Sequence, residues 1–161
     1  MTVSFEIALH QGCRLRETSV PMSDVDVTRR TITFRAKGRR GTPHVFTTSL
    51  HPGLDGLMEQ LRKAGARQTC AMPAMAGRLW WSFRQENKLG HTTFHATRVT
   101  VVTRLARAGV PIQQAMRFVG HADETVHAIY QKLQADDLSA CTDALSFGKP
   151  ARIRRGGAAR L

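Results

Sequence analysis

The distribution of apolar and polar side chains predicts two consecutive helices in the second half of the chain. The first begins near His95, and Gly109 ends it. Pro111 begins the second helix, which continues to Gly120. Each helix has one apolar side, as expected for helices that pack on a core. The expected inward residues are Val101, Val102, Leu105 and Ala108 in the first and Ile112, Ala115, Met116 and Val119 in the second, with Thr100, Thr103, Arg104 and Arg107 expected to face outward.

Three earlier stretches also have helical periodicity. Residues 1–12 predict a short helix that ends at Gly12, residues 51–66 predict an amphipathic helix, and residues 77–89 predict a third. Residues 66–77 contain small residues and a proline without a steady period, so we expect a loop there. The expected inward residues are Phe5, Ala8 and Leu9, then Leu54, Leu57, Met58 and Leu61, then Leu79, Trp80 and Phe83. Trp81 lies off this apolar side and is expected to pack under the loop, with stacking on a nucleotide as the alternative.

Residues 25–48 have the pattern of strands. Thr31 to Phe34 and Val45 to Thr48 are rich in β-branched and aromatic residues, and the sequence KGRRGTP between them is typical of a hairpin turn. The expected fold class is therefore α+β, a mostly helical domain with a small antiparallel β-sheet near the N-terminal third.

The length and composition favour one domain. A chain of 161 residues with 42% apolar residues can bury one ordinary core. We expect residues 1–147 to form it and to end in a helix over 136–147, with Leu138, Cys141, Ala144 and Leu145 inward. Residues 148–161 are rich in glycine and basic residues without apolar periodicity, so we expect a flexible basic tail.

The formal net charge of +12 indicates a polyanionic partner, most simply double-stranded DNA. Residues 14–40 contain eight Lys or Arg and three acidic residues, so the sheet is expected to present positive charge. Five of the cations are in the tail, which weakens the argument for a basic folded surface. The alternative is a basic protein without such a partner. If DNA is the partner, we expect the loop over 66–77 to order around it.

The sequence contains no apolar stretch of membrane length and no targeting segment, so a cytoplasmic location is expected. Three cysteines without C-x-x-C spacing indicate neither a disulfide framework nor a zinc knuckle. His91 and His95 have the spacing of a two-histidine metal site on a helix, but no third ligand accompanies them. We expect no metal.

Arg98 departs from the apolar pattern of its helix because it lies on the inward side. His95 is expected on the same side. An arginine beside a histidine suits the binding of an anion such as phosphate, whereas a buried salt bridge from Arg98 to a carboxylate is the structural alternative. The helix alone does not separate the two.

Further residues favour a catalytic site over a structural salt bridge. His121 follows Gly120 at a corner, and a further helix that Asp123 or Thr125 caps would carry Tyr130, the only tyrosine of the chain. The hydroxyl of Tyr130 is a potential nucleophile, which a catalytic site uses and a structural ion pair does not require.

These residues resemble the tyrosine recombinases, also called phage integrases. That family has H-x-x-R, then G-H about twenty residues later, then a tyrosine nine residues after that histidine, and here these positions are His95, Arg98, Gly120, His121 and Tyr130. The sequence GCRLRE resembles the family's G-x-R-x-x-E, with Arg14 as its first catalytic arginine and Glu17 as the companion acid. The resemblance also places the catalytic lysine at Lys37.

The resemblance implies a catalytic domain that cleaves and rejoins DNA through a 3′-phosphotyrosyl intermediate without a cofactor. Its expected catalytic residues are Arg14, Lys37, His95, Arg98, His121 and Tyr130, and Arg39 and Arg40 are candidates for DNA contacts. It also implies self-association on DNA through the last helix, and a prokaryotic, phage or mobile-element origin.

Two features depart from the family pattern. The N-terminal core-binding domain is missing from this sequence, so the front is expected to be truncated, and the middle of H-A-T-R has A-T where D-L is more usual. Two alternatives stay open. One is relaxation of DNA by a type IB topoisomerase-like activity, and the other is a non-catalytic DNA-binding fragment.

Overall fold

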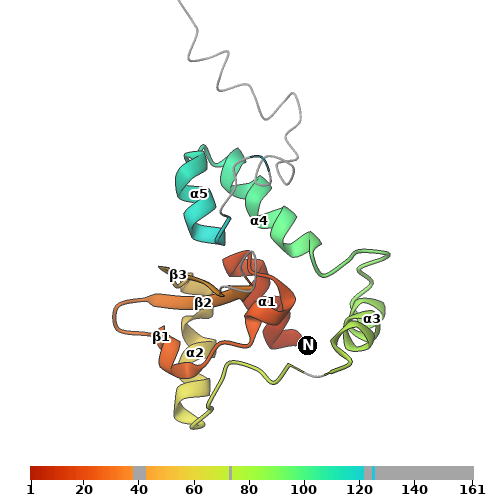
Figure 1. Ribbon diagram of the computed structural model, residues 1–161. Coiled ribbons are helices and arrows are strands. Elements are labelled where there is room, and N and C mark those ends of the chain that lie inside the picture. The colour runs from red at the N-terminus through yellow and green to blue at the C-terminus, as the bar shows by residue number, and fades with distance from the viewer. Residues whose placement is uncertain (38–42, 73, 122–124, 126–161) are drawn as a thin grey trace, which may run out of the picture.

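The computed structural model describes residues 1–37, 43–72, 74–121 and 125 (Figure 1). Its α-helices are α1 (Thr2–Gln11), α2 (Asp55–Lys63), α3 (Ala76–Glu86), α4 (Ala96–Arg107) and α5 (Ile112–Val119). Short 3-10 helices are η1 (Leu15–Thr18), η2 (Met22–Asp24) and η4 (Pro52–Leu54). The predictions for the hairpin turn, Tyr130 and its helix, the helix over 136–147 and the basic tail lie outside the described residues.

The predicted hairpin is present as part of a three-stranded antiparallel sheet. Strand β1 (Val25–Asp26) pairs with β2 (Thr31–Lys37), which pairs with β3 (Pro43–Ser49). Along β2, Ile32, Phe34 and Ala36 are buried, so the alternation of side chains turns one face of the sheet toward the core. The expectation of a mostly helical α+β fold with a small sheet is confirmed.

Helix α1 occupies the middle of the described part (Figure 1). The sheet and α2 lie on one side of it, the α4–α5 pair lies above α1 with α5 against β3, and α3 is peripheral. The larger apolar cluster joins α1 to the sheet, α2 and α3 through side chains that include Ile7, Phe34, Met58 and Trp80. A smaller cluster of Val101, Val102 and Val119 holds α4 against α5.

A buried amide fastens α1 to the end of the sheet. The side chain of Gln11, which is fully buried, donates a 3.0 Å hydrogen bond to the carbonyl of Ser49 and accepts one of 2.8 Å from the backbone N–H of His51. Both functions of the amide are thus satisfied inside the protein. The segment that follows α1 is therefore held in a defined position relative to β3.

Some predicted orientations were wrong. Thr103, expected to face outward from α4, is buried, whereas Ala108 is exposed. Leu79 and Trp81 in α3 are 44% and 54% exposed, so neither packs as expected. Helical periodicity identified α3 correctly, but the side that turns inward is set by Trp80, whose ring lies against Phe5 and Phe94.

The loop over 66–77 is partly ordered by the protein itself. The backbone N–H of Met22 donates to the carbonyl of Arg67, and that of Thr69 donates to the carbonyl of Val20. Thr69 is buried. The expectation that this loop orders only around DNA was therefore wrong for its first half, because β-like pairing with residues 20–22 holds it.

Two described arginines of the sheet region are paired with acidic residues. Arg35 donates to Asp24 through two hydrogen bonds of 2.8 and 3.0 Å, and Arg30 lies 3.1 Å from Asp55. These acids offset part of the positive charge expected for this region. In the described ranges, no helix is long and apolar enough to cross a membrane.

Candidate active site

Two helix ends meet beside the first turn of α4. Helix α1 ends at Gly12 and α5 ends at Gly120, and both glycines adopt left-handed backbone conformations, with φ of 67° and 68°. This conformation closes a helix and strongly favours glycine. A Cβ at Gly12 would lie 2.8 Å from the Val119 side chain, so the two helix ends pack closely. The geometry creates a small space into which a side chain from α4 enters.

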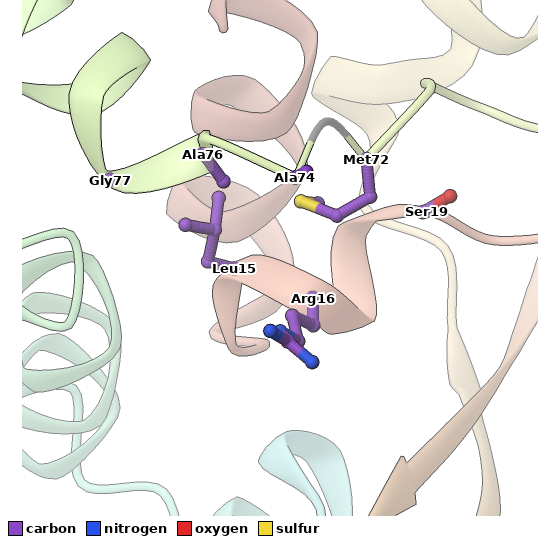
Figure 2. A pocket seen from close by; sticks show the side chains of 7 residues that line it. All are labelled: Leu15, Arg16, Ser19, Met72, Ala74, Ala76 and Gly77. Atoms are coloured by element: carbon purple, nitrogen blue, oxygen red, sulfur yellow. The ribbon is translucent and has the colours of Figure 1, made fainter.

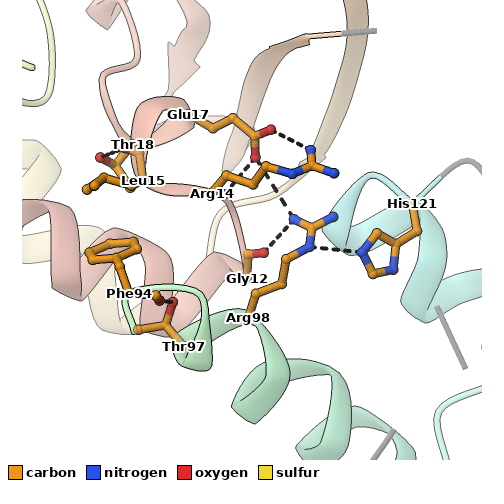
Figure 3. A network of polar contacts seen from close by, with 9 residues as sticks. All are labelled: Gly12, Arg14, Leu15, Glu17, Thr18, Phe94, Thr97, Arg98 and His121. Carbon is orange, nitrogen blue, oxygen red and sulfur yellow. Dashed lines mark hydrogen bonds and ion pairs between the residues drawn. The ribbon is translucent and has the colours of Figure 1, made fainter. Parts of the chain in front are cut away.

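The side chain that enters is Arg98. It is fully buried, its Nη1 donates a 2.7 Å hydrogen bond to the Gly12 carbonyl, and its Nε donates a 2.9 Å bond to Nε2 of His121 (Figure 3). Because His121 accepts through Nε2, that nitrogen carries no proton in this arrangement. Arg98 thus joins the C-terminal ends of α1 and α5.

Glu17 brings a second arginine into the same group. Its carboxylate accepts a 2.7 Å bond from the backbone N–H of Arg14 and a 2.8 Å bond from the Arg14 guanidinium, and it lies 3.9 Å from Nη1 of Arg98 (Figure 3). The Arg14 side chain is 48% exposed, whereas that of Arg98 is 1% exposed. One arginine is accessible from outside and the other supports it from within.

The geometry answers the question that the sequence left open for Arg98. The buried carboxylate partner exists and is Glu17. Among the described residues, two guanidinium groups lie within 4 Å of this one carboxylate. Water screens charges weakly at such a buried position, so an anion interacts with a guanidinium there more strongly than at the surface.

His95 completes the cluster from the start of α4. It caps the helix one turn before Arg98. The pKa of His95 is lowered from its ordinary value of 6.5, first by burial and then by the positive charges of Arg98 and Arg14. The imidazole is therefore neutral near pH 7, which lets it accept a proton.

A sequence comparison identifies the group of proteins that shares this arrangement. The model of the phage integrase family matches residues 2–136. The chain belongs to the phage integrase family. A search of curated protein sequences found no match.

Solved structures of other proteins share the fold. The chain matches the XerA recombinase with a TM-score of 0.68 and 17% identity, over 92% of this chain and 59% of that protein. It matches the Tn1549 transposon integrase in complex with a circular intermediate DNA with a TM-score of 0.67 and 19% identity, over 89% of this chain and 58% of that one. For the XerH site-specific recombinase bound to a palindromic difH substrate the values are 0.61 and 16%, over 90% and 44%. The chain thus spans less than two thirds of each.

The structure brings four of the six residues expected from the integrase pattern into one region: Arg14, His95, Arg98 and His121. Lys37 is the last residue of β2, where its backbone pairs with Pro43, and its side chain lies outside the description. Tyr130, Arg39 and Arg40 are also outside the described residues.

The departure in the H-A-T-R motif is accommodated locally. The hydroxyl of Thr97 donates a 2.8 Å hydrogen bond to the carbonyl of Phe94 and is buried in the first turn of α4 (Figure 3). A threonine there thus satisfies its own polar group within the turn that precedes Arg98. The unusual residue leaves Arg98 in its contact with His121.

The Gly12 carbonyl has a role that the sequence does not reveal. Gly12 was expected only to end a helix, yet its carbonyl accepts one of the Arg98 hydrogen bonds. No local pattern identifies such an acceptor, because any residue has a carbonyl and only the fold aims it. Glu17 was found as a companion of Arg14, but its closeness to Arg98 was not.

Neither Cys13 nor His91 adds to the chemistry. Burial, together with the charge of Glu17, raises the pKa of the Cys13 thiol far above its usual range, so the thiol stays protonated and unreactive. His91 precedes α4 and is exposed, so the helical spacing assumed for a metal pair with His95 was wrong. No group of three metal-binding side chains is found among the residues that the structure describes.

An open hollow of about 640 Å³ lies beside the cluster, between η1 and the start of α3. Figure 2 shows Leu15 and Met72 in this space, with Arg16 on the adjoining turn. Its other lining residues are Ser19, Ala74, Ala76 and Gly77. It has no acid–base group apart from the arginine, so we assign the chemistry to the Arg98 cluster.

Proposed function

We propose that this chain is the catalytic domain of a site-specific DNA recombinase or integrase. It cleaves and rejoins strands of double-stranded DNA through a 3′-phosphotyrosyl intermediate. The observation that carries the proposal is the joining of Arg14 and Arg98, from opposite parts of the sequence, around Glu17, with His121 bonded to Arg98. Membership of the integrase family supports it.

The two arginines suit the electrostatic demand of phosphodiester cleavage. In the transition state, negative charge grows on the non-bridging oxygens of the phosphate, and fixed cationic donors stabilise it. Glu17 holds Arg14 by bonds to its backbone and its side chain, so the guanidinium is placed before substrate arrives. Buried Arg98 adds a second positive charge that water screens weakly.

Proton transfer is assigned to the remaining family residues. Tyr130 attacks the phosphorus with its phenolic oxygen and displaces the 5′ oxygen, and rejoining reverses the step with a new 5′ hydroxyl. His95, neutral near pH 7, and His121 position the phosphate and take the proton of Tyr130. Lys37 protonates the departing 5′ oxygen. The phosphotyrosyl ester replaces the phosphodiester that is broken, so rejoining requires no external energy source.

The remaining assignments extend this function to the rest of the chain. We assign residues 1–147 to the catalytic domain, Arg39 and Arg40 to contacts with the DNA backbone, and the helix over 136–147 to docking on a neighbouring protomer. The proposed location is the cytoplasm of a prokaryotic cell, with a phage or mobile element as the source of the gene. Complexes of DNA with the Tn1549 integrase and XerH support DNA as the partner.

The test is capture of the covalent intermediate. The 161-residue chain is incubated with nicked duplexes whose sequence is randomised around the nick, so that a short cleaved fragment diffuses away and traps the adduct. We expect a protein–DNA adduct that survives denaturation. Tyr130→Phe should form none while binding the same DNA within a small factor, as measured by fluorescence anisotropy, because only the nucleophilic oxygen is lost.

The outcomes separate an enzyme that cleaves DNA from a fragment that only binds it. An adduct that persists in Tyr130→Phe contradicts the assignment of the nucleophile. DNA binding by the unmutated chain without any adduct would instead indicate the non-catalytic binding fragment.

A further inference from the structure

The aromatic ring of Phe46, in the middle of β3, lies directly against the backbone of Gly120. A Cβ added at Gly120 would overlap this ring and would lie 2.8 Å from its Cδ1 atom. Glycine is therefore required at position 120 for two reasons. A side chain would overlap the Phe46 ring, and the φ of 68° disfavours any side chain. The contact of Phe46 with Gly120 is therefore part of the packing of β3 against the end of α5.

The backbone beside this contact determines where His121 points. The Gly120 N–H and the His121 N–H both donate to the carbonyl of Met116, which fixes the turn that follows α5. The side chain of the next residue then reaches Arg98, with 2.9 Å between its Nε2 and the arginine Nε. A shift of the Gly120 backbone would carry the His121 ring with it.

The ring of Phe46 is itself held in place. It lies 5.4 Å, between centroids, from Phe34 of β2 and 5.4 Å from His44, at interplanar angles of 31° and 24°. Phe34 is 1% exposed and belongs to the main core. Because Phe34 and Phe46 are also direct cross-strand partners, the contact between their rings is reinforced by the β2–β3 pairing.

We propose that Phe46 is a positioning residue for DNA cleavage, whose ring seats the Gly120 turn so that His121 meets Arg98. This inference rests on the proposed function. It explains why the strand pair that carries Lys37 at the end of β2 also contacts α5. One hairpin then sets the places of both Lys37 and His121, which lie in separate parts of the sequence.

The first test is the Phe46→Leu variant of the full chain. The ring on Gly120 is lost while most of the apolar bulk remains. We expect adduct formation to slow by about ten- to a hundredfold, the scale expected when a supporting residue lets a reacting group move by about 1 Å. DNA affinity should stay within a small factor.

The matched control is Ile32→Ala. Ile32 is fully buried on β2 in the same apolar cluster, and it pairs with Thr48 rather than with Phe46. It should lower the unfolding temperature at least as much as Phe46→Leu does, with an unchanged cleavage rate below that temperature. Equal slowing in both variants would overturn the proposal, because general loss of stability would then explain the effect.

A second readout does not depend on activity. The imidazole nitrogens of His121 are followed by NMR, with assignment from His121→Gln, because a ring that accepts through Nε2 has a distinct nitrogen signature. Phe46→Leu should weaken that signature and Ile32→Ala should leave it intact. If the unmutated chain forms no adduct, the proposed function fails, whereas an unaltered His121 signature in Phe46→Leu overturns the positioning role.

A double-mutant cycle tests the contact itself. Gly120→Ala should slow cleavage strongly in the presence of the Phe46 ring. In the Phe46→Ala background the overlap is gone, so the same substitution should have a smaller additional effect. Additive effects would show that the two residues act separately and would contradict the inference.

Discussion

The Nε atom of Arg98 lies 2.9 Å from Nε2 of His121, and the two residues are separated by 23 positions in the chain. Helix α4 supplies the first and the turn after α5 supplies the second. With the Gly12 carbonyl and Glu17 on the other side, the buried arginine connects three segments of the sequence. Arg98 therefore holds these segments together and is also a candidate phosphate ligand.

Arg98→Lys should slow DNA cleavage by at least about a hundredfold, the scale of losing one transition-state oxyanion donor. Lysine retains the positive charge but cannot make the bonds to Gly12 and His121 at once. Arg98→Ala should also lower the free energy of unfolding by about 3–5 kcal/mol, because a large buried side chain is lost and the Gly12 carbonyl and His121 lose their hydrogen-bond donor. Single-turnover cleavage and chemical denaturation measure the two effects.

Arg104→Lys is the control for this prediction. Arg104 lies on the exposed side of the same helix, so its replacement should change neither cleavage nor stability appreciably. If Arg98→Lys instead lowers stability at an unchanged cleavage rate, the residue is a structural ion pair alone.

Gly12→Ala should destabilise the protein and slow cleavage together. Any side chain in the left-handed conformation costs about 1–2 kcal/mol. In addition, the new Cβ would lie 2.8 Å from Val119 Cγ1, which pushes the Gly12 carbonyl away from Arg98. Gly65→Ala is the matched control, since φ is 64° there and no atom lies within 4 Å of the added Cβ. Equal losses of stability and equal rates in the two variants would show that the packing is unimportant.

His95 and His51 should make stability fall in acid. Burial is the first cause of the lowered pKa of each, so the folded state binds protons less readily than the unfolded chain does. The free energy of unfolding should therefore decline as the pH drops below about 6.5, and level off once the folded-state pKa values are passed. Denaturation curves across this window provide the measurement.

In His95→Gln, the acid decline in the free energy of unfolding should be smaller, and only the part due to His51 should remain. In His51→Gln, only the part due to His95 should remain. The two sites differ in function. The cleavage rate should fall at acid pH in the unmutated chain and in His51→Gln, because the neutral imidazole of His95 serves as a proton acceptor. In His95→Gln this fall should be absent, and the rate should be lower at every pH. An unchanged pH profile of cleavage in His95→Gln would contradict that role.

Lys37→Ala should slow cleavage of ordinary DNA strongly, since the 5′ oxygen would leave as a high-energy alkoxide without a proton donor. A substrate with sulfur in place of the bridging 5′ oxygen separates this role from phosphate binding, because a thiolate leaves readily without a proton. On that substrate Lys37→Ala should approach the unmutated rate, whereas Arg98→Lys should stay slow. Equal defects on both substrates would reassign Lys37 to phosphate binding and favour Arg39, Arg40 or His121 as the donor.

Local pattern in the sequence was enough to determine the secondary structure. Apolar periodicity places α4 and α5, and the glycines at 109 and 120 mark their ends, because helix formation depends on nearby residues and on the groups that satisfy helix ends. The strand pair was predictable for the same reason. Identifying the family depended on a few side chains at set intervals, which a sequence displays directly.

Only the tertiary structure decided which groups touch. Arg98 could be assigned to the inward side of its helix, but neither the carbonyl of Gly12 nor the carboxylate of Glu17 could be named as its partner, because both come from a segment more than 80 residues away. Tertiary packing also determines which side of α3 is exposed and brings Arg35 of the sheet against Asp24. Such choices depend on the sum of many weak contacts between distant segments, and no local interval in a sequence encodes that sum.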